Sequence, residues 1–285
     1  MNGMAHTLVC FHAHPDDEAL LTAGVMAKAA TEGHRVVLVV ATRGDVGQVA
    51  DDFLGDGEGL ADRRWRELEH SADLLGVARL EWLGYSDSGD GEGGDFINPS
   101  GPRAADAFVV ADREGAARRL ADILEEEEAD VLTTYDPNGG YGHPDHLQVH
   151  AVGARAAEMA GTPIVLEATI NRDLMRMGVD IAHSLGLEMP PDFAPETFDA
   201  WYTPAAELTH AVDVRAQLPA KRASMEAHTS QTTSAQGSAT RSLAVFLALP
   251  PEYFELAFGT EWFVDRARPP GVTADSVFDS WAGRG

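Results

Sequence analysis

The chain has 285 residues, of which 44% are hydrophobic, and this size and composition allow one large α/β domain or such a domain with an appendage. Its 46 Asp and Glu residues against 21 Lys and Arg residues give a formal net charge of -25, which makes nucleic acid and anionic membrane surfaces unexpected partners. The single cysteine, Cys10, excludes an intramolecular disulfide, and the first residues lack the basic segment and apolar run of a signal peptide. We therefore expect a cytoplasmic protein without a membrane-spanning segment.

The first 40 or so residues predict a β-α-β unit. Thr7–Phe11 is a continuous apolar run, the pattern of a strand buried on both faces of a parallel sheet. Apolar residues then recur at helical spacing over Glu18–Glu32, with Gly33 as a stop, and Arg35–Ala41 reads as a second buried strand. Such crossovers are nearly always right-handed, so the helix should cover one face of a parallel sheet.

The alternation of strands and helices continues to about residue 170. Further strands are predicted at Leu80–Leu83, Val131–Tyr135 and Pro163–Thr169, and further helices at Leu60–Gly76, Asp112–Glu128 and His143–Ala160. This order predicts an α/β fold with a Rossmann-like, doubly wound, mostly parallel sheet. Two long glycine-rich segments, Thr42–Gly59 and Gly84–Asp106, interrupt it, and loops of this length are usually functional or disordered.

The pattern changes after about residue 170. Thr209–Val214 has the composition of a strand and Arg215–His228 that of a helix, while Val245–Leu249 and Tyr253–Phe258 are apolar enough to pack against the sheet. We expect residues 1–170 to form the Rossmann-like catalytic domain. Residues 171–285 would form a smaller C-terminal α+β subdomain that walls the active site.

Two short segments of similar sequence indicate where that site lies. His14–Glu18 reads H-P-D-D-E after the first strand, and His143–His146 reads H-P-D-H after the strand that ends at Tyr135. In each segment, proline stands at the natural first position of a helix. The carboxyl ends of parallel strands share one edge of the sheet, where open α/β sheets bind their ligands, so both segments should lie at that edge.

Together the two segments supply ligands for a metal ion, namely His14, Asp17 and His146. Three protein ligands with water in a remaining position is the arrangement of catalytic zinc, which lowers the pKa of bound water to about 7. Asp16 is beside the predicted ligand Asp17 and is placed to accept the proton of that water. His143, one helical turn before His146, is placed to stabilise an oxyanion or a leaving amine.

A purely structural interpretation competes with this one. Proline at the first helical position, followed by acidic residues in the first turn, stabilises the start of a helix without any further role. For either segment alone, this interpretation is at least as good as the functional one. The joint occurrence of the two segments, each after a buried strand and with a long glycine-rich loop nearby, favours a site.

The residues A-H-P-D-D-E at Ala13–Glu18 and G-G-Y-G-H-P-D-H at Gly139–His146 resemble the LmbE-like (PIG-L) family of zinc-dependent N-acetylglucosaminyl deacetylases. The likeness is greatest to the actinobacterial branch that makes or recycles mycothiol, which includes a deacetylase of N-acetylglucosaminyl-inositol and the mycothiol conjugate amidase. It covers most of Thr7–Ala160. The resemblance implies one zinc ion per chain, with iron(II) as the alternative, held by the three ligands named above.

The resemblance also implies roles for individual residues. Asp16 would be the general base and later the acid, His143 the electrostatic partner, and Tyr141 the group that binds the carbonyl oxygen or oxyanion. Asp45, in Thr42-Arg43-Gly44-Asp45, stands where the family motif has Glu. The implied substrate-binding residues are Arg64, Asp87, Asp45 and, from the weaker match A-H-T-S-Q at residues 227–231, His228.

The expected function is therefore metal-dependent removal of an N-acetyl group from a GlcNAc-type amino sugar, with a substrate like N-acetylglucosaminyl-inositol favoured. A mycothiol-conjugate amidase and an antibiotic-pathway sugar deacetylase remain alternatives within the family. A non-catalytic metal- or sugar-binding protein is an alternative of another class, and Asp16 argues against it because a pure binder needs no spare carboxylate beside its ligands. Homo-oligomers are common in the family, although no stretch of this sequence identifies an interface.

Overall fold

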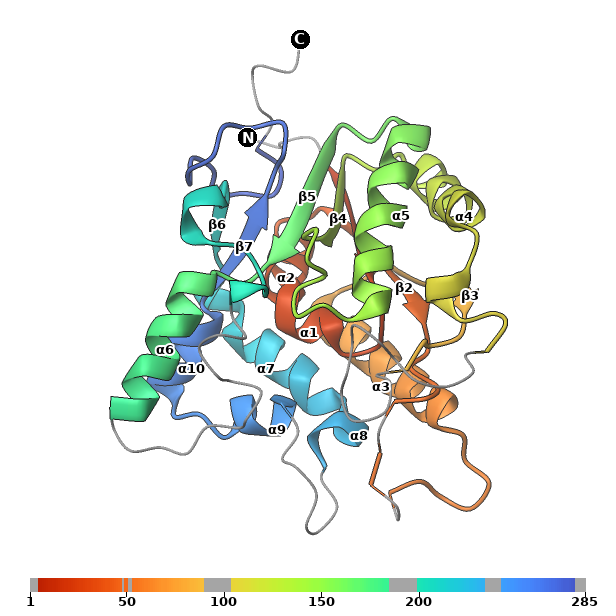
Figure 1. The fold of residues 1–285 in the computed structure, drawn as a ribbon, viewed down its shortest axis with the longest axis horizontal. Coiled ribbons are helices and arrows are strands. Elements are labelled where there is room, and N and C mark those ends of the chain that lie inside the picture. Colours follow the sequence, from red (N-terminus) through yellow and green to blue (C-terminus); the bar gives the residue numbers. More distant parts are fainter. Residues whose placement is uncertain are drawn as a thin grey trace.

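A mostly parallel sheet of seven strands runs through the described part of the computed structural model, which comprises residues 5–47, 49–50, 53–89, 104–184, 199–233 and 242–279 (Figure 1). In chain order the strands are β1 (Thr7–His12), β2 (Arg35–Thr42), β3 (Arg79–Tyr85), β4 (Val131–Tyr135), β5 (Ile164–Thr169), β6 (His210–Asp213) and β7 (Thr260–Val264). Their order in the sheet is β3-β2-β1-β4-β5-β7-β6, parallel from β3 to β5 and antiparallel where β7 joins β5 and β6. The expected α/β architecture is confirmed. Residues 90–103 of the second glycine-rich segment lie outside the described residues.

Helices cover both faces of this sheet (Figure 1). The α-helices are α1 (Asp17–Leu21), α2 (Ala23–Thr31), α3 (Leu60–Leu75), α4 (Arg113–Glu126), α5 (Pro144–Ala160), α6 (Arg172–Ser184), α7 (Leu218–Ala227), α8 (Thr229–Thr232), α9 (Ser242–Leu247) and α10 (Pro251–Phe258). Successive residues of β1 point to opposite faces, so Val9 and Phe11 pack with α4 and α5 whereas Leu8 and Cys10 pack with α2 and α3. This two-sided burial is the reason why the strand reads as a continuous apolar run.

The helix predicted at Glu18–Glu32 is instead two helices, α1 and α2, separated at Thr22. The side chain of Glu261 on β7 accepts hydrogen bonds from the backbone N–H groups of Gly24 and Val25, each at 2.8 Å. A carboxylate at this position satisfies the free N–H groups of a helix start. The prediction of one continuous helix was wrong here. The side chain that binds the N–H groups at the start of α2 belongs to Glu261, 237 positions from Gly24, so no local sequence pattern indicates a helix start at this place.

Residues after 170 return to the same sheet. β6 confirms the strand predicted at Thr209–Val214, and β6 and β7 extend the sheet beyond β5. The predicted Arg215–His228 helix corresponds to a 3-10 turn at Arg215–Gln217 followed by α7. α9 and α10 pack against α1 and α7 through a cluster made of Ala19, Met225, Leu243, Phe254 and Phe258. The division into residues 1–170 and 171–285 stays a prediction, and the sheet crosses that boundary.

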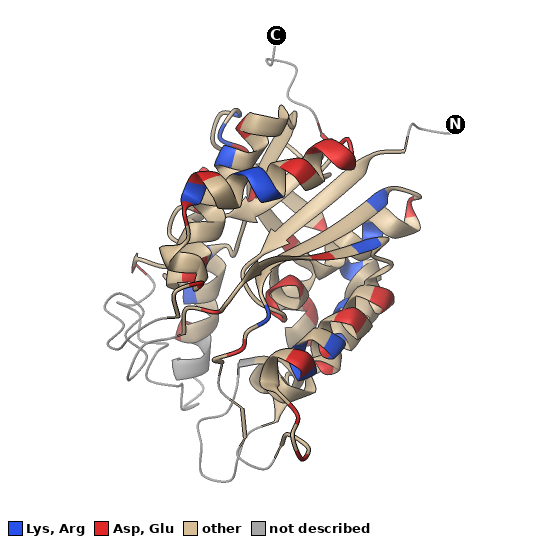
Figure 2. Cartoon of the chain, turned by 90° about the vertical axis from the view of Figure 1, so that its right-hand side faces the viewer, with Lys and Arg blue, Asp and Glu red and all other residues tan. Residues whose placement is uncertain are grey.

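Charged side chains of both signs are spread along the outer faces of the helices (Figure 2). Several form ion pairs within or between elements, such as Arg155 with Glu114 and Glu158. Within the described ranges, no helix combines the length and apolarity needed to cross a membrane. Cys10 is fully buried on β1, and burial raises the pKa of its thiol to about 12.

Candidate active site and metal centre

The structure brings the two H-P-D segments together at the carboxyl edge of the sheet. β1 and β4 are adjacent and parallel, with Val9 opposite Leu132, so the segments that follow them leave the sheet side by side. The ring centroids of His14 and His143 lie 4.7 Å apart, and that of His146 lies 5.4 Å from His14 and 5.3 Å from His143. All three imidazoles are buried.

Asp17 lies between two of these histidines. Its Oδ2 is 3.5 Å from His14 Nδ1, and its Oδ1 is 3.4 Å from His146 Nε2. The Nε2 atom of His146 is buried and has no hydrogen-bond partner among the residues that the structure describes. A buried nitrogen without such a partner, beside a carboxylate and a second imidazole, fits a metal ligand better than a packed core histidine.

Nearby charges favour a cation at this place. Burial lowers the pKa of His14, but the carboxylates of Asp87, Asp145 and Asp17 outweigh burial and raise the pKa well above its ordinary value. Burial raises the pKa of Asp17, but His146 and His14 outweigh it and hold the pKa well below its usual range. The carboxylates that favour a proton on His14 would equally favour a divalent cation, whose binding displaces that proton.

Asp16 has an unusual backbone conformation. Its φ of 114° is in the left-handed region, which for a residue other than glycine costs about 1–3 kcal/mol and persists only where its surroundings impose it. Its N–H donates to Glu18 Oε2 at 2.9 Å, and Arg64 Nη2 donates to Asp16 Oδ1 at 3.2 Å. The Asp16 side chain keeps 22% of its surface exposed, so solvent or a ligand can reach it. Burial raises the pKa of its carboxyl to about 6, against the opposing effect of Arg64.

Arg64 reaches the site from α3 through a space that two glycines leave open. Its guanidinium donates to the carbonyls of Pro15 at 2.5 Å and Gly44 at 3.3 Å. A Cβ atom at Gly44 would lie 2.1 Å from Arg64 Nη1, and one at Gly47 would lie 2.6 Å from it. The glycine-rich segment after β2 therefore gives this arginine room to approach Asp16.

Asp45 and Asp87 lie at the same edge of the sheet. Asp45 Oδ1 accepts the N–H of Asp87 at 2.8 Å, and Asp87 Oδ1 lies 3.4 Å from His14 Nε2. Asp87 also accepts the N–H of Gly89 at 2.9 Å. Burial raises the pKa of Asp87, but His14 outweighs burial and holds the pKa far below its usual range. Of the two predicted substrate-binding carboxylates, Asp87 therefore lies beside His14, a predicted metal ligand, and Asp45 contacts the backbone of Asp87.

His228 is buried beside the first H-P-D segment, and its predicted role in substrate binding stays a prediction. It is fully buried, and its Nε2 is 2.6 Å from Glu18 Oε1. Burial lowers the pKa of His228, but the carboxylates of Glu18 and Asp16 outweigh burial and raise it. The described geometry therefore joins His228 to the first H-P-D segment rather than to an open surface.

Tyr141 and His143 follow the loop after β4. The Tyr141 ring centroid lies 4.9 Å from that of His146 and 6.2 Å from that of His143. His143 is the N-cap of α5, and its Nδ1 accepts the backbone N–H of Asp145 at 3.1 Å. Because Nδ1 accepts a hydrogen bond, the ring proton of neutral His143 must be on Nε2, which makes this atom a donor.

Sequence reasoning missed Asp145. This residue is fully buried, its Oδ2 lies 3.2 Å from His14 Nε2, and it accepts hydrogen bonds from both the N–H and the hydroxyl of Ser88. It therefore fixes the orientation of the His14 ring, as a carboxylate behind a metal-binding histidine often does. Its place in the second H-P-D segment, matching Asp16 in the first, was the available signal.

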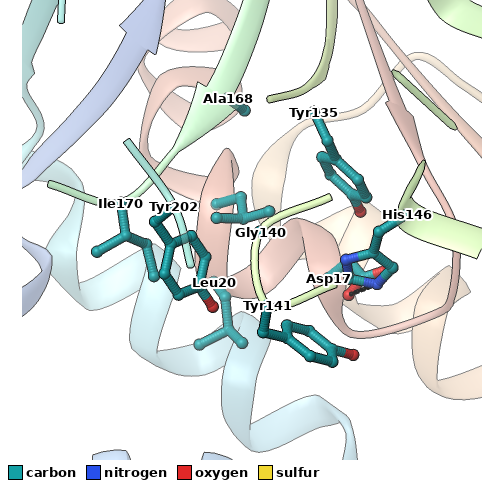
Figure 3. A pocket seen from close by; sticks show the side chains of 10 residues that line it. Asp17, Leu20, Tyr135, Gly140, Tyr141, His146, Ala168, Ile170 and Tyr202 are labelled. Atoms are coloured by element: carbon teal, nitrogen blue, oxygen red, sulfur yellow. Dashed lines mark ion pairs between the residues drawn. The ribbon is translucent and has the colours of Figure 1, made fainter. Parts of the chain in front are cut away.

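A cavity opens beside Asp17 and His146, whose side chains face one another at one end of it (Figure 3). The other lining residues are mainly apolar or aromatic: Leu20, Leu21, Tyr135, Gly140, Tyr141, Ala168, Ile170 and Tyr202. Tyr202, from beyond residue 170, donates its N–H to the carbonyl of Gly140 at 2.8 Å and so ties this wall to the loop that carries Tyr141. Tyr202 and Ile170 have no sequence motif that could have identified them.

Comparison with known proteins identifies the family of this chain. The profile of the PIG-L family, described as GlcNAc-PI de-N-acetylase, matches residues 9–157. The 1D-myo-inositol 2-acetamido-2-deoxy-alpha-D-glucopyranoside deacetylase of Rhodococcus opacus (strain B4) is 32% identical over 273 residues, which cover 88% of this chain and 91% of that protein. The protein of the same name from Thermomonospora curvata is 34% identical, with 95% of each chain covered.

Solved structures share the fold at lower sequence identity. The N,N'-diacetylchitobiose deacetylase from Pyrococcus horikoshii matches with a TM-score of 0.57 and 22% identity, over 93% of this chain and 84% of that one. The zinc-inhibited form of teicoplanin deacetylase Orf2 matches with a TM-score of 0.57 and 18% identity, over 91% and 97%. A 4-carboxy-2-hydroxymuconate hydratase, GalB from Pseudomonas putida KT2440, matches with a TM-score of 0.53 and 17% identity, over 92% and 96%, so the fold alone does not fix the reaction. The profile match and the sequence relatives do fix the family: this chain belongs to the PIG-L family of GlcNAc-PI de-N-acetylases.

Proposed function

We propose that the protein is a metal-dependent hydrolase that removes the acetyl group from a 2-acetamido sugar, with N-acetylglucosaminyl-inositol as the favoured substrate. The observation that carries the proposal is the buried group formed by His14, Asp17 and His146 with the partly exposed carboxylate of Asp16 beside it. The choice of substrate is supported by the names of the relatives that are 32–34% identical over most of the chain.

We propose zinc as the metal, with iron(II) as the alternative, and His14, Asp17 and His146 as its ligands. Two imidazole nitrogens and one carboxylate oxygen form a donor set that suits zinc, and the hydrogen bond between His14 and Asp145 gives the set a supporting carboxylate. When bound, such a metal supplies a Lewis acid that polarises an amide carbonyl and lowers the pKa of a water molecule. The ligand atoms of His14, His143 and His146 all lie within 4.8 Å of one another, so His143 is also close enough to contact a metal ion at this place.

Asp16 would act as the general base. A carboxyl with a pKa of about 6 is largely ionised at neutral pH yet basic enough to take a proton from the attacking water. Once protonated, it can deliver that proton to the leaving amine. Arg64, 3.2 Å from Asp16 Oδ1, would fix the direction of the carboxylate during both transfers.

His143 and Tyr141 would stabilise the negative charge that develops on the amide oxygen. The proton of neutral His143 is on Nε2, so the ring can donate a hydrogen bond to an oxyanion without first being protonated. Tyr141 lines the cavity beside His146, and its hydroxyl would be a second donor for the same oxygen.

The two sides of the site would receive the two parts of the substrate. The apolar cavity beside Asp17 and His146 suits the methyl end of an acetyl group (Figure 3). Arg64, Asp87 and Asp45 supply charged groups that suit sugar or inositol hydroxyls. The amide bond would thus lie between an apolar pocket and a cluster of mostly buried charged side chains, next to the proposed metal ligands and Asp16.

The replacement Asp16→Asn tests the proposal, because asparagine keeps the shape of the side chain but cannot accept the proton. Acetate release from N-acetylglucosaminyl-inositol should fall about 10²- to 10⁴-fold while the bound metal is retained. Turnover within about twofold of wild type would contradict the role of Asp16. A panel of larger amides, assayed in parallel, separates a deacetylase from a conjugate amidase.

A further inference from the structure

A fully buried polar network joins Asp16 to the C-terminal part of the chain. Glu18 is its centre: Oε2 accepts the N–H of Asp16 at 2.9 Å, and Oε1 accepts the hydroxyl of Ser71 at 2.6 Å. His228 Nε2 lies 2.6 Å from the same Oε1 atom. Glu18, Ser71 and His228 are each 0% exposed, so none of them can touch a ligand in solution without a change of structure.

The network meets Asp16 at its backbone N–H, so it restrains the rotation φ about the N–Cα bond. A residue with φ of 114° is stable only where surrounding groups hold it, and two side chains contribute to this here. Glu18 binds the N–H of Asp16, and Arg64 binds both the carbonyl of Pro15 and the carboxylate of Asp16. Loss of the Glu18 bond would leave the Arg64 contacts and the hydrogen bond from the Ala19 N–H to the Asp16 carbonyl, at 3.1 Å, to oppose relaxation of the backbone.

α3 connects this network to the segment that carries His228. Arg64, Glu67 and Ser71 are spaced to lie on one face of the helix, and each makes a different contact. Arg64 binds Asp16, Ser71 binds Glu18, and Glu67 accepts the N–H of Ser230 at 2.9 Å and its hydroxyl at 2.6 Å. The start of α8 is therefore fixed on α3, with His228 aimed at Glu18.

We propose that His228 and Glu18 are positioning residues for Asp16. His228 donates to Glu18, which holds the N–H of Asp16 and thereby the direction of its carboxylate. This inference rests on the proposed function, in which Asp16 moves the proton. It also gives His228 a role different from the substrate binding implied by the sequence resemblance.

The test compares His228→Ala with His228→Gln in acetate release. Glutamine can place an N–H donor where Nε2 of histidine lies, so it should restore most of the turnover that alanine loses. For His228→Ala we expect kcat to fall about 10- to 100-fold, the effect of a misplacement of about 1 Å, with KM within about twofold and the metal retained. A raised KM with unchanged kcat would instead show loss of substrate binding and would overturn the proposal.

His210→Ala is the matched control. His210 is also fully buried, but it lies on β6 at the far edge of the sheet, where its Nδ1 is 2.8 Å from Thr209 Oγ1. It should lose stability and keep the kcat of the folded fraction. If His228→Ala does not fold, Ser71→Ala removes a single donor to Glu18, and it should lower kcat without changing KM. An unchanged kcat in that variant, or an equal fall in kcat in His210→Ala, would overturn the proposal.

A crystal structure of His228→Gln and of either alanine variant separates this inference from the proposed function. If wild type releases no acetate from any amide, the proposed function fails, and the conformation of Asp16 still decides the inference. We expect the φ of Asp16 to stay positive in His228→Gln and to become negative in the alanine variant. An Asp16 that keeps φ near 114° after loss of the His228 and Ser71 donors would refute the positioning role.

Discussion

Replacing Gly44 with alanine should push the Arg64 guanidinium away from Asp16. The added Cβ would lie 2.1 Å from Nη1 and 2.4 Å from Cζ of Arg64, whereas ordinary contacts begin at 3.4 Å, so the guanidinium must move by about 1.3 Å. A shift of this size breaks the 3.2 Å contact with Asp16 and the 2.5 Å hydrogen bond to Pro15. Because misplacement by about 1 Å near the reacting groups costs up to about 100-fold, we expect acetate release to fall about 10- to 100-fold.

Gly57→Ala is the control that isolates this effect. Gly57 has φ of 74°, close to the 65° of Gly44, but a Cβ there meets nothing within 4 Å. Alanine at either position is strained by about 1–2 kcal/mol, so backbone strain should lower the thermal stability of both variants by a similar amount. Only Gly44→Ala should lose activity, measured as kcat on the folded protein. Equal activity of the two variants would refute the assignment of Arg64 as the residue that orients Asp16.

Two further changes test the pocket and the core. Ile170→Ala enlarges the cavity beside Asp17, so kcat/KM for an N-butyryl substrate relative to the N-acetyl substrate should rise at least about 10-fold; an unchanged ratio would place the acyl group elsewhere. Lys221→Met leaves the buried Glu261 carboxylate without its 2.6 Å partner, so urea unfolding should show a loss of about 3–5 kcal/mol. Lys28→Met, at a partly exposed lysine whose Nζ donates to the Asp213 carbonyl, should change stability by less than about 0.5 kcal/mol, and equal effects of the two would argue against the buried pair.

The sequence predicted the parallel part of the sheet because burial on both faces leaves a plain apolar pattern. β1, for example, reads as Thr7–Phe11 in the sequence and spans Thr7–His12 in the structure. The meeting of the two H-P-D segments was also predictable, since any two parallel strands present their carboxyl ends at one edge. The order of strands was not, because pairing depends on long-range contacts that leave no local pattern.

Residues that act through distant partners were the ones that sequence reasoning could not place. Glu261 accepts the N–H of Gly24 at the start of α2 although the two residues are 237 positions apart in the sequence. His228 contacts Glu18 across 210 positions. Tyr202 and Ile170 line the cavity as ordinary apolar or aromatic side chains, which carry no chemical signature in a sequence. Local sequence spacing identifies functional side chains within one helix or loop. The contacts named here form only in the folded chain, between residues far apart in the sequence.

Metal content is the most direct test of the central claim that His14, Asp17 and His146 hold a catalytic metal. Elemental analysis should compare wild type, His146→Ala and the control His70→Ala, an exposed histidine on α3, all purified without chelators and assayed for acetate release. We predict about one zinc or iron per chain in wild type and in His70→Ala, and loss of both metal and acetate release in His146→Ala. Wild type without metal, or His146→Ala with full metal and turnover, would contradict the account.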